Sequence, residues 1–292
     1  MIRWASPSLI SLRYNGLMTI NLSACAIKDG LGTTVMGCRV RSFAKTRSTM
    51  DVARRMAESE AAEGTLVVAD TQTSGRGRFN RPWVSPPGTN LTFSIVLRPS
   101  PELLRDVNMA ATVALVRCIR ELTGLTATAK WPNDIRIGGG KVCGLLVEGA
   151  LAGGSTGSPR TEDGPPTGSG HSGYVILGIG LNVNYDPTPV LDPPAEATSL
   201  ATELGRTVSR LDVLRAFLRT FDALYRTLDA GGSLYQEWRS CLDTLGQHVR
   251  VRWGNQIEEG VASDVDRNGD LILRRADGST VSLNAGEVTL QA

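Results

Sequence analysis

The sequence predicts an α+β fold in which a large unit of strands and helices precedes a small C-terminal β-barrel. Apolar segments of strand length alternate with amphipathic helical segments up to residue 245. Within that unit, the glycine turn at 138–140 joins two strands as an antiparallel hairpin. Beyond Gly246, turn signals separate five short strand segments within about 45 residues, which is typical of a small barrel.

Composition limits the function classes before any motif is considered. The 292 residues carry 31 Lys and Arg against 29 Asp and Glu, so the net charge is only +2, which argues against a strongly basic DNA-binding protein. No apolar run reaches the ~18 residues of a membrane span. Five scattered cysteines without a CxxC pair favour a reducing cytoplasm over a disulfide framework or a zinc site. The scarcity of histidine, with only His171 and His248, disfavours a Ser-His-Asp hydrolase.

The first half of the chain is expected to hold a helix and two buried strands. The helix begins after Ser48 as its cap, and Gly64 is placed to stop it. A buried strand over Thr65–Asp70 follows directly. Another strand, Leu91–Arg98, comes after the turn at Pro86-Pro87-Gly88.

Further helices are predicted over Asp106–Leu122, ending before Gly124, and over Leu211–Leu228, whose apolar stripe indicates the core. Tyr174–Asn184 has the continuous apolar character of a central strand. Residues 153–173 contain no aliphatic or aromatic side chain, so we expect a disordered insertion there. Three more strands are predicted over Ala127–Trp131, Ile135–Ile137 and Val142–Glu148. The chain would then divide into an N-terminal extension (1–36), a large domain (37–245) and the small β domain (246–292).

A loop that alternates Gly and Arg follows the first buried strand. In Gly75-Arg76-Gly77-Arg78, the glycines allow close backbone approach to a ligand, and the guanidinium groups supply fixed positive charge. The loop therefore suits an anion. The same string also fits a solvated flexible loop or a fragment of the RGG repeats that bind RNA.

The string Lys130-Trp131-Pro132-Asn133-Asp134 combines a cation, a large ring, a rigid turn and two short hydrogen-bonding side chains. These are the components of a nucleotide pocket. Taken alone, the string is better explained as a Pro-Asn-Asp turn with Trp131 in the core and Lys130 on the surface.

Together, four strings resemble the biotin protein ligase family in order and spacing. They are Gly-Arg-Gly-Arg at 75–78, Lys-Trp-Pro-Asn-Asp at 130–134, Lys-x-x-Gly-x-Leu-x-Glu at 141–148 and Gly-Ile-Gly-Leu-Asn-Val-Asn at 178–184. The resemblance covers roughly Gly37 to Leu228 and, more loosely, the C-terminal barrel. It implies a mixed, mostly antiparallel sheet flanked by helices, like that of class II aminoacyl-tRNA synthetases and biotin ligases, with an SH3-like barrel.

The resemblance further implies an ATP-dependent reaction in two steps. The biotin carboxylate attacks the α-phosphate of ATP, and a lysine of a biotin carboxyl carrier domain then attacks the resulting biotinyl-adenylate. Bringing two anions together requires positioning and positive charge rather than a protein nucleophile, which suits a chain nearly devoid of histidine. The expected ligands are ATP, Mg²⁺ and biotin, and the expected partner is the carrier domain, with a homodimer left open.

Ser48, Thr49 and Gln72 match family residues near the polar head group of biotin, where a ureido ring needs donors and acceptors in fixed places. Many family members carry Asn after the Ser-Thr pair. Here Met50 occupies that place and could instead pack on the thiophane ring.

Arg76, Gly77 and Arg78 match the biotin-binding loop that folds over the intermediate, with Arg78 placed to bridge carboxylate and phosphate. Lys141 matches the lysine that contacts both the biotin carboxyl group and the α-phosphate. The resemblance thus makes Lys141 and Arg78 the expected catalytic residues.

On the nucleotide side, Arg81 matches a phosphate contact and Trp83 an adenine contact. Asp134 is in addition the candidate for orienting Mg²⁺ or the adenine edge. The remaining residues expected at the nucleotide are Lys130, Asn133, Asp134 and Asn182.

A lipoate or octanoate ligase shares the adenylation chemistry and is the nearest alternative, although the Gly-Arg-Gly-Arg and Lys-Trp-Pro-Asn-Asp strings favour biotin. A non-catalytic biotin-binding regulator is less expected, because Arg78 and Lys141 are both present. About 40 residues precede the resemblance, too few for a winged helix-turn-helix domain, so we expect no DNA-binding regulation.

Overall fold

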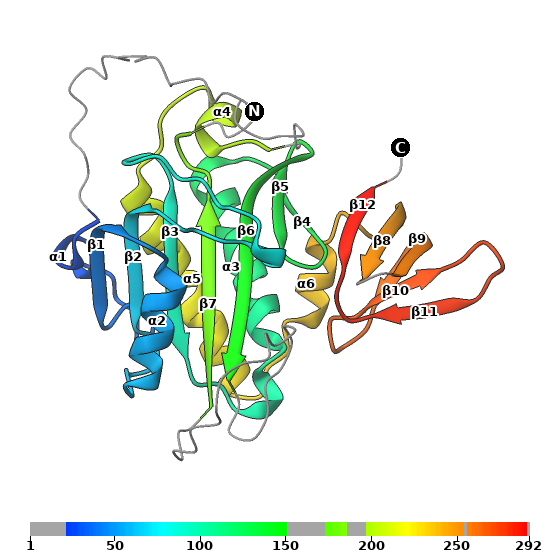
Figure 1. Cartoon of the computed structure of the whole chain (residues 1–292), viewed down its shortest axis with the longest axis horizontal. Helices are drawn as coiled ribbons and strands as arrows, with labels where there is room; N and C mark the ends of the chain where they lie inside the picture. The colour runs from blue at the N-terminus through cyan, green and yellow to red at the C-terminus, as the bar shows by residue number, and fades with distance from the viewer. Residues whose placement is uncertain (1–21, 151–172, 186–196, 254–255, 291–292) are drawn as a thin grey trace, which may run out of the picture.

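The computed structural model describes residues 22–150, 173–185, 197–253 and 256–290 (Figure 1). Except for Gly173, the predicted insertion at 153–173 lies outside these residues. The helices are α1 Ala24–Lys28, α2 Thr49–Glu58, α3 Asp106–Thr123, α4 Leu200–Leu204, α5 Arg210–Asp229 and α6 Tyr235–Cys241, with short 3₁₀ turns at Arg78–Asn80 and Pro101–Leu103. None of these helices is long and apolar enough to cross a bilayer.

A seven-stranded sheet in the order β1-β2-β3-β7-β6-β5-β4 forms the large domain. Among the described strands of this sheet, β1 and β2 are the only neighbours that pair in parallel, so the expected mixed and mostly antiparallel sheet is confirmed. The hairpin predicted at the glycine turn is the β5–β6 pair. The strands are β1 Val40–Thr46, β2 Leu66–Gln72, β3 Leu91–Leu97, β4 Ala127–Lys130, β5 Asp134–Ile137, β6 Gly140–Ala150 and β7 Tyr174–Leu181.

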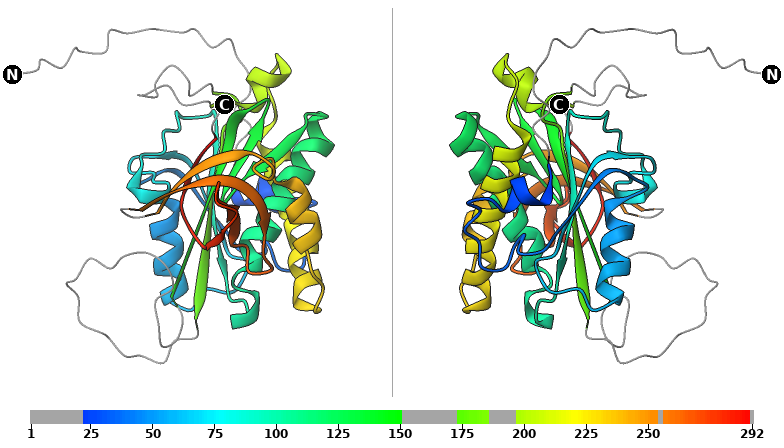
Figure 2. Two further views of the ribbon diagram at one scale, coloured as in Figure 1. Left: turned by 90° about the vertical axis from the view of Figure 1, so that its right-hand side faces the viewer. Right: turned by 90° about the vertical axis from the view of Figure 1, so that its left-hand side faces the viewer.

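Helices cover both faces of this sheet. Figure 2 shows α2 on one side and α3 with α5 on the other. The main core lies on the α3–α5 side, whereas a smaller apolar cluster of Met50, Ala53 and Ala57 packs α2 onto Val67, Val96 and Ile176. Because α2 is short, it covers only part of its face and leaves the rest for a site.

The structure corrects the expected end of the first helix. α2 ends at Glu58 with Ser59 as its C-cap, not at Gly64. Gly64 lies in the turn into β2 with φ +73°, and a Cβ there would lie 2.1 Å from the carbonyl oxygen of Val35. Glycine is therefore required at position 64 because the backbone of Val35 lies so close, and not because a helix ends there. Ser48 is at the N-cap, but its side chain makes no capping hydrogen bond.

The described part of the predicted N-terminal extension packs into the large domain. Ile27 is fully buried in the main core. The carboxylate of Asp222 on α5 accepts hydrogen bonds from the backbone N–H groups of Val35 and Met36 at 2.7 and 2.8 Å. Long-range contacts therefore attach this segment, which composition alone does not reveal.

The C-terminal domain contains the five predicted strands as an antiparallel sheet in the order β11-β10-β9-β8-β12. Among the described residues β11 and β12 are the two edges and do not pair, so the sheet stays open where a closed barrel was expected. The strands are β8 His248–Trp253, β9 Gln256–Val265, β10 Leu271–Arg274, β11 Thr280–Leu283 and β12 Glu287–Leu290.

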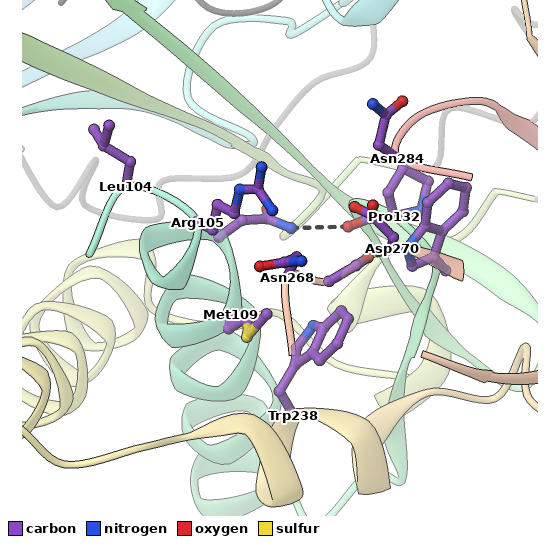
Figure 3. A pocket seen from close by; sticks show the side chains of 11 residues that line it. Leu104, Arg105, Met109, Pro132, Trp238, Asn268, Asp270 and Asn284 are labelled. Carbon is purple, nitrogen blue, oxygen red and sulfur yellow. Dashed lines mark hydrogen bonds between the residues drawn. The ribbon is translucent and has the colours of Figure 1, made fainter. Parts of the chain in front are cut away.

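Trp131 joins the two domains. Its side chain is 2% exposed, and its indole Nε1 donates to the carbonyl oxygen of Gly269 at 2.8 Å. Beside it lies a hollow of ≈170 Å³, lined from the large domain by Met109 and Trp238 and from the C-terminal sheet by Asn268 (Figure 3). The core position expected for Trp131 is confirmed, and its partner is the other domain.

We predict that Trp131→Ala lowers the free energy of unfolding by about 3–5 kcal/mol, because a large buried ring and a buried hydrogen bond are both lost. Urea denaturation measures the change. Trp253→Ala is the matched control, since that side chain is 48% exposed and its loss is expected to cost less than about 0.5 kcal/mol. Equal effects of the two substitutions would contradict the interdomain role of Trp131.

Candidate functional site

A row of residues without bulky side chains crosses the sheet on the α2 face. Strand register aligns Thr92 of β3, Gly180 of β7 and Gly144 of β6, and the row continues to Asp134 of β5 and Lys130 of β4. Paired residues of neighbouring strands point to the same face. The row therefore combines small residues at its centre with charged side chains at one end.

A second row lies next to the first, with Ser94 of β3 paired to Gly178 of β7. We call these residues together the floor: Thr92, Ser94, Gly144, Gly178 and Gly180. The sequence string at 178–184 contains two of its glycines, but only the register shows that they align with Gly144.

Two side chains rest directly on the floor. A Cβ at Gly180 would lie 2.4 Å from Cε2 of Trp83, and one at Gly178 would lie 2.4 Å from Sδ of Met50. A Cβ at Gly144 would lie 3.3 Å from Nζ of Lys141. A side chain at 180 would displace the rigid Trp83 indole, whereas one at 178 would require the flexible end of Met50 to move.

A polar cluster stands at the N-terminus of α2. The backbone N–H and hydroxyl of Thr49 donate to Oε1 of Gln72 at 2.7 and 3.1 Å, and the hydroxyl of Ser94 donates to that of Thr49 at 2.8 Å. Buried Ser48 accepts a long hydrogen bond of 3.5 Å from Arg76. The structure thus brings together Ser48, Thr49 and Gln72 as expected, and adds Ser94.

Arg76 spans from α2 to β6. Its guanidinium pairs with Asp51 at 2.7 Å and with Glu148 at 3.5 Å, and Glu148 also pairs with Arg54. Burial alone would lower the pKa of Arg76, but the hydrogen bond to Asp51 and the charge of Glu148 outweigh it and raise the pKa. Sequence reasoning missed Asp51 and assigned no role to Glu148, although the Lys-x-x-Gly-x-Leu-x-Glu string contains it.

Arg78 connects the loop to both domains. Its Nη1 donates to Oδ1 of Asn133 at 3.2 Å and to the carbonyl oxygen of Gly286 at 3.0 Å. Burial lowers the pKa of Arg78, and the charges of Asp134 and Glu287 oppose that effect. In Figure 1 the cyan segment after β2 accordingly crosses the sheet toward β12.

Lys141 lies at the charged end of the floor, with Nζ 2.6 Å from Oδ1 of Asp134. Burial lowers the pKa of Lys130, and the charge of Asp134 again opposes it. Arg78, Lys130 and Lys141 therefore lie near Asp134, and Glu287 and Asp243 are further carboxylates near Arg78 and Lys130. Arg81 and Arg136 add positive charge at the same end, so cations outnumber carboxylates there, which favours an anionic ligand.

Arg81 and Asn182, the last two residues expected at the nucleotide, lie at the margin of the site. Arg81 is largely exposed and pairs with Glu287 at 2.5 Å. Asn182 is buried, and its amide bonds Asn90 and the carbonyl oxygen of Thr198. The N–H of Thr198 in turn donates to the carbonyl oxygen of Lys141 at 2.9 Å, so Asn182 supports the backbone behind Lys141.

Comparison with known proteins shows the family to which the chain belongs. A model of the biotin/lipoate A/B protein ligase family matches residues 42–157, and one of the biotin protein ligase C-terminal domain matches residues 244–290. The chain is 36% identical over 262 residues to the bifunctional ligase/repressor BirA of Bacillus subtilis, covering 88% of this chain and 76% of that protein. The chain belongs to the biotin protein ligase family.

Two further relatives support the family assignment. The biotin--[acetyl-CoA-carboxylase] ligase of Mycobacterium tuberculosis is 31% identical over 260 residues, covering 84% of this chain and 86% of that one. The biotin protein ligase from Aquifex aeolicus in complex with biotin and ATP aligns with a TM-score of 0.69 at 25% identity, covering 87% of this chain and 99% of that one. The resemblance inferred from the four strings is confirmed.

As a member of this family, the chain presents a site with two unlike ends. The polar cluster at α2 offers fixed donors and acceptors, and the end at Lys141 offers positive charge. Between them, the indole Nε1 of Trp83 is buried and has no hydrogen-bond partner among the described residues. A bound ligand on the floor could supply that partner.

We predict that Gly180→Ala displaces the Trp83 indole from the floor, because the new Cβ would lie 2.4 Å from Cε2. The emission of Trp83, taken as the difference between proteins with and without Trp83→Phe, is expected to shift to the red. Gly149→Ala on β6 is the control, since its Cβ would meet nothing closer than 3.3 Å. An unchanged spectrum for Gly180→Ala would refute the close packing.

Proposed function

We propose that this biotin protein ligase forms biotinyl-5′-AMP from biotin and ATP and then transfers biotin to a lysine of a biotin carboxyl carrier domain. The observation that carries the proposal is the convergence of Arg78 and Lys141 around Asp134, at one end of a floor whose other end is the polar cluster. The names of the Mycobacterium tuberculosis and Aquifex aeolicus relatives support biotin, ATP and a carboxylase acceptor.

In the first step, a carboxylate oxygen of biotin attacks the α-phosphorus of ATP, and the bond to the pyrophosphate oxygen breaks. Both reactants are anions, so the barrier contains their mutual repulsion. Lys141 and Arg78 would reduce that repulsion and stabilise the charge on phosphorus. Ser48, Thr49 and Gln72 would hold the ureido ring, which directs the carboxylate of the extended molecule toward Lys141.

On the nucleotide side, we assign the adenine to Trp83 and the phosphates to Lys130 and Arg81. Arg81 would exchange its partner Glu287 for phosphate. Asn133 holds Arg78 through its Oδ1, while its Nδ2 donates to the carbonyl oxygen of Leu145 at 2.6 Å. Asn133 thereby fixes the cation, and Asn182 acts behind Lys141 as a positioning residue.

Mg²⁺ fits this site only together with ATP. Among the described residues, no group of three or more His, Cys, Asp or Glu side chains is placed to hold a metal ion. Phosphate oxygens would supply most ligands and Asp134 a carboxylate, and the ion would neutralise part of the phosphate charge.

In the second step, the neutral amine of the carrier lysine attacks the carbonyl carbon of the mixed anhydride, an amide bond forms, and AMP leaves. No protein nucleophile is required for either step. The cytoplasmic location and the lack of DNA and membrane partners stay predictions from the sequence, which leaves a homodimer open.

ATP–pyrophosphate exchange tests the proposed function. We expect exchange with biotin, and less than a hundredth of that rate with lipoate or octanoate at equal concentration, because the polar cluster matches a ureido ring. Exchange with lipoate or octanoate alone would identify the rival ligase. Biotin binding without any exchange would identify a regulator and reject the ligase.

We predict that Lys141→Ala lowers kcat/KM for biotin in the exchange assay by about 100-fold, on the scale of ~3 kcal/mol for a lost transition-state donor. The matched control is Lys28→Ala, an exposed lysine outside the floor, which is expected to stay within twofold of the unaltered protein. A Lys141→Ala variant within twofold would remove this lysine from the mechanism.

A further inference from the structure

The string at 141–148 ends on Glu148, a carboxylate that neither step of the proposed reaction uses. Glu148 lies on the α2 face of β6, because strand register pairs it with Ile176 of β7, which packs in the cluster under α2. Its side chain is 24% exposed and is thus largely removed from water. A charge in such a place needs partners of opposite sign.

Two arginines from different elements meet at this carboxylate. Oε2 of Glu148 pairs with Arg54 of α2 and, at 3.5 Å, with Arg76 of the loop after β2. Arg76 pairs in turn with Asp51 at 2.7 Å, and Asp51 and Arg54 are neighbours on the surface of α2, three positions apart. The four charges alternate in sign and cancel. Arg76 is therefore tied to α2 directly and a second time through Glu148.

The two arginines of the loop differ in their partners. Both guanidinium nitrogens that Arg76 uses in these pairs face carboxylates, so its charge is already matched within the protein. Arg78 instead donates to the uncharged oxygens of Asn133 and Gly286. Arg76 thus has the contacts of an anchor, whereas Arg78 remains suited to an anionic ligand.

The loop is a short hairpin that these arginines hold at two separate points. Two backbone hydrogen bonds of 2.8 and 2.9 Å close it within residues 75–83, and Arg76 faces Pro82 across it. Arg76 fixes the hairpin to α2 and β6, and Arg78 fixes it to Asn133 and the C-terminal domain. Loss of the first attachment would leave the second intact, so each can be tested alone.

We propose that Glu148 is a positioning residue, which holds Arg76 against α2 and thereby keeps the hairpin in place beside the polar cluster. This inference rests on the proposed function, which assigns the polar cluster to the ureido ring of biotin. Nη1 of Arg76 also donates to the hydroxyl of Ser48 at 3.5 Å, so the anchor lies at that end of the floor and not at the end of Lys141. Glu148 acts on biotin through Arg76 and not by contact.

Glu148→Gln tests this role, because it keeps the shape of the side chain and removes its charge. We expect the KM for biotin in pyrophosphate exchange to rise about tenfold, on the scale of the coupling within one network of charged groups. The KM for ATP and kcat should stay within about twofold, because the attachment through Arg78 is unchanged. An equal rise of both KM values would show a general loosening of the site and overturn the proposal.

A double-mutant cycle shows whether Glu148 acts through Arg76. The variants are Glu148→Gln, Arg76→Gln and the two together. If the effect passes through Arg76, the double variant should have the same KM for biotin as Arg76→Gln alone, within about twofold. If the two single effects instead multiply in the double variant, Glu148 acts independently of Arg76 and the proposal is wrong.

The matched control is Glu237→Gln, which removes the same charge from another ion pair. Glu237 of α6 pairs with Arg117 of α3, which lies on the opposite side of the sheet from α2, and its side chain is 35% exposed (Figure 2). Its KM for biotin should stay within about twofold of that of the unaltered protein. A rise of the same size in both variants would show a general effect of losing an ion pair and would overturn the positioning role.

Two further outcomes separate this role from the function on which it rests. If the unaltered protein shows no pyrophosphate exchange with biotin, the proposed function fails and the role of Glu148 fails with it. If exchange with biotin is normal and Glu148→Gln leaves the KM for biotin unchanged, the positioning role alone is wrong.

Discussion

The site depends on a patch of bare backbone at the centre of the large sheet. At Gly178 and Gly180 a single Cβ would come within 2.4 Å of Met50 and Trp83, so the glycines set how deeply these side chains can sit. Strand register places Gly144 beside Gly180 and thereby extends the bare patch to Asp134. Met50, Trp83 and Lys141 pack directly against this floor, and the other groups of the site lie around it.

The charged groups and the C-terminal domain are arranged around this floor. Positive groups collect at the end where Lys141 meets Asp134, and hydrogen-bonding groups collect at the end where Thr49 meets Gln72. The loop of Arg76 and Arg78 lies between these ends. Arg76 pairs with Asp51 of α2 and Glu148 of β6, and Arg78 donates to the carbonyl oxygen of Gly286 in the C-terminal domain. The C-terminal domain is thus part of the site, because the carbonyl group of Gly286, just before β12, accepts a hydrogen bond from the half-buried Arg78.

Local patterns predicted the elements whose causes are local. Apolar runs and an αL glycine at 124 placed α3 within one residue, and the glycine turn at 138–140 placed the β5–β6 hairpin. Local patterns failed where a distant contact decided the outcome. Gly64 was expected to end a helix, but glycine is required there because the carbonyl group of Val35 lies too close for a Cβ. Residues 22–36 were expected to belong to an extension, but Asp222 on α5 accepts hydrogen bonds from their backbone. The prediction of a closed C-terminal barrel was also wrong: β11 and β12 are only three residues apart in the chain, yet among the described residues they do not pair.

The sequence by itself determined the residue types of the site and their order, because the four strings keep their chemistry whatever the surrounding structure. Only the tertiary structure decided which groups meet. Ser94 joins Thr49, and Glu148 joins Arg76, through the register of strands far apart in the chain. Hydrogen bonds and ion pairs act over a few ångströms, and only folding brings residues separated by tens of positions within that range.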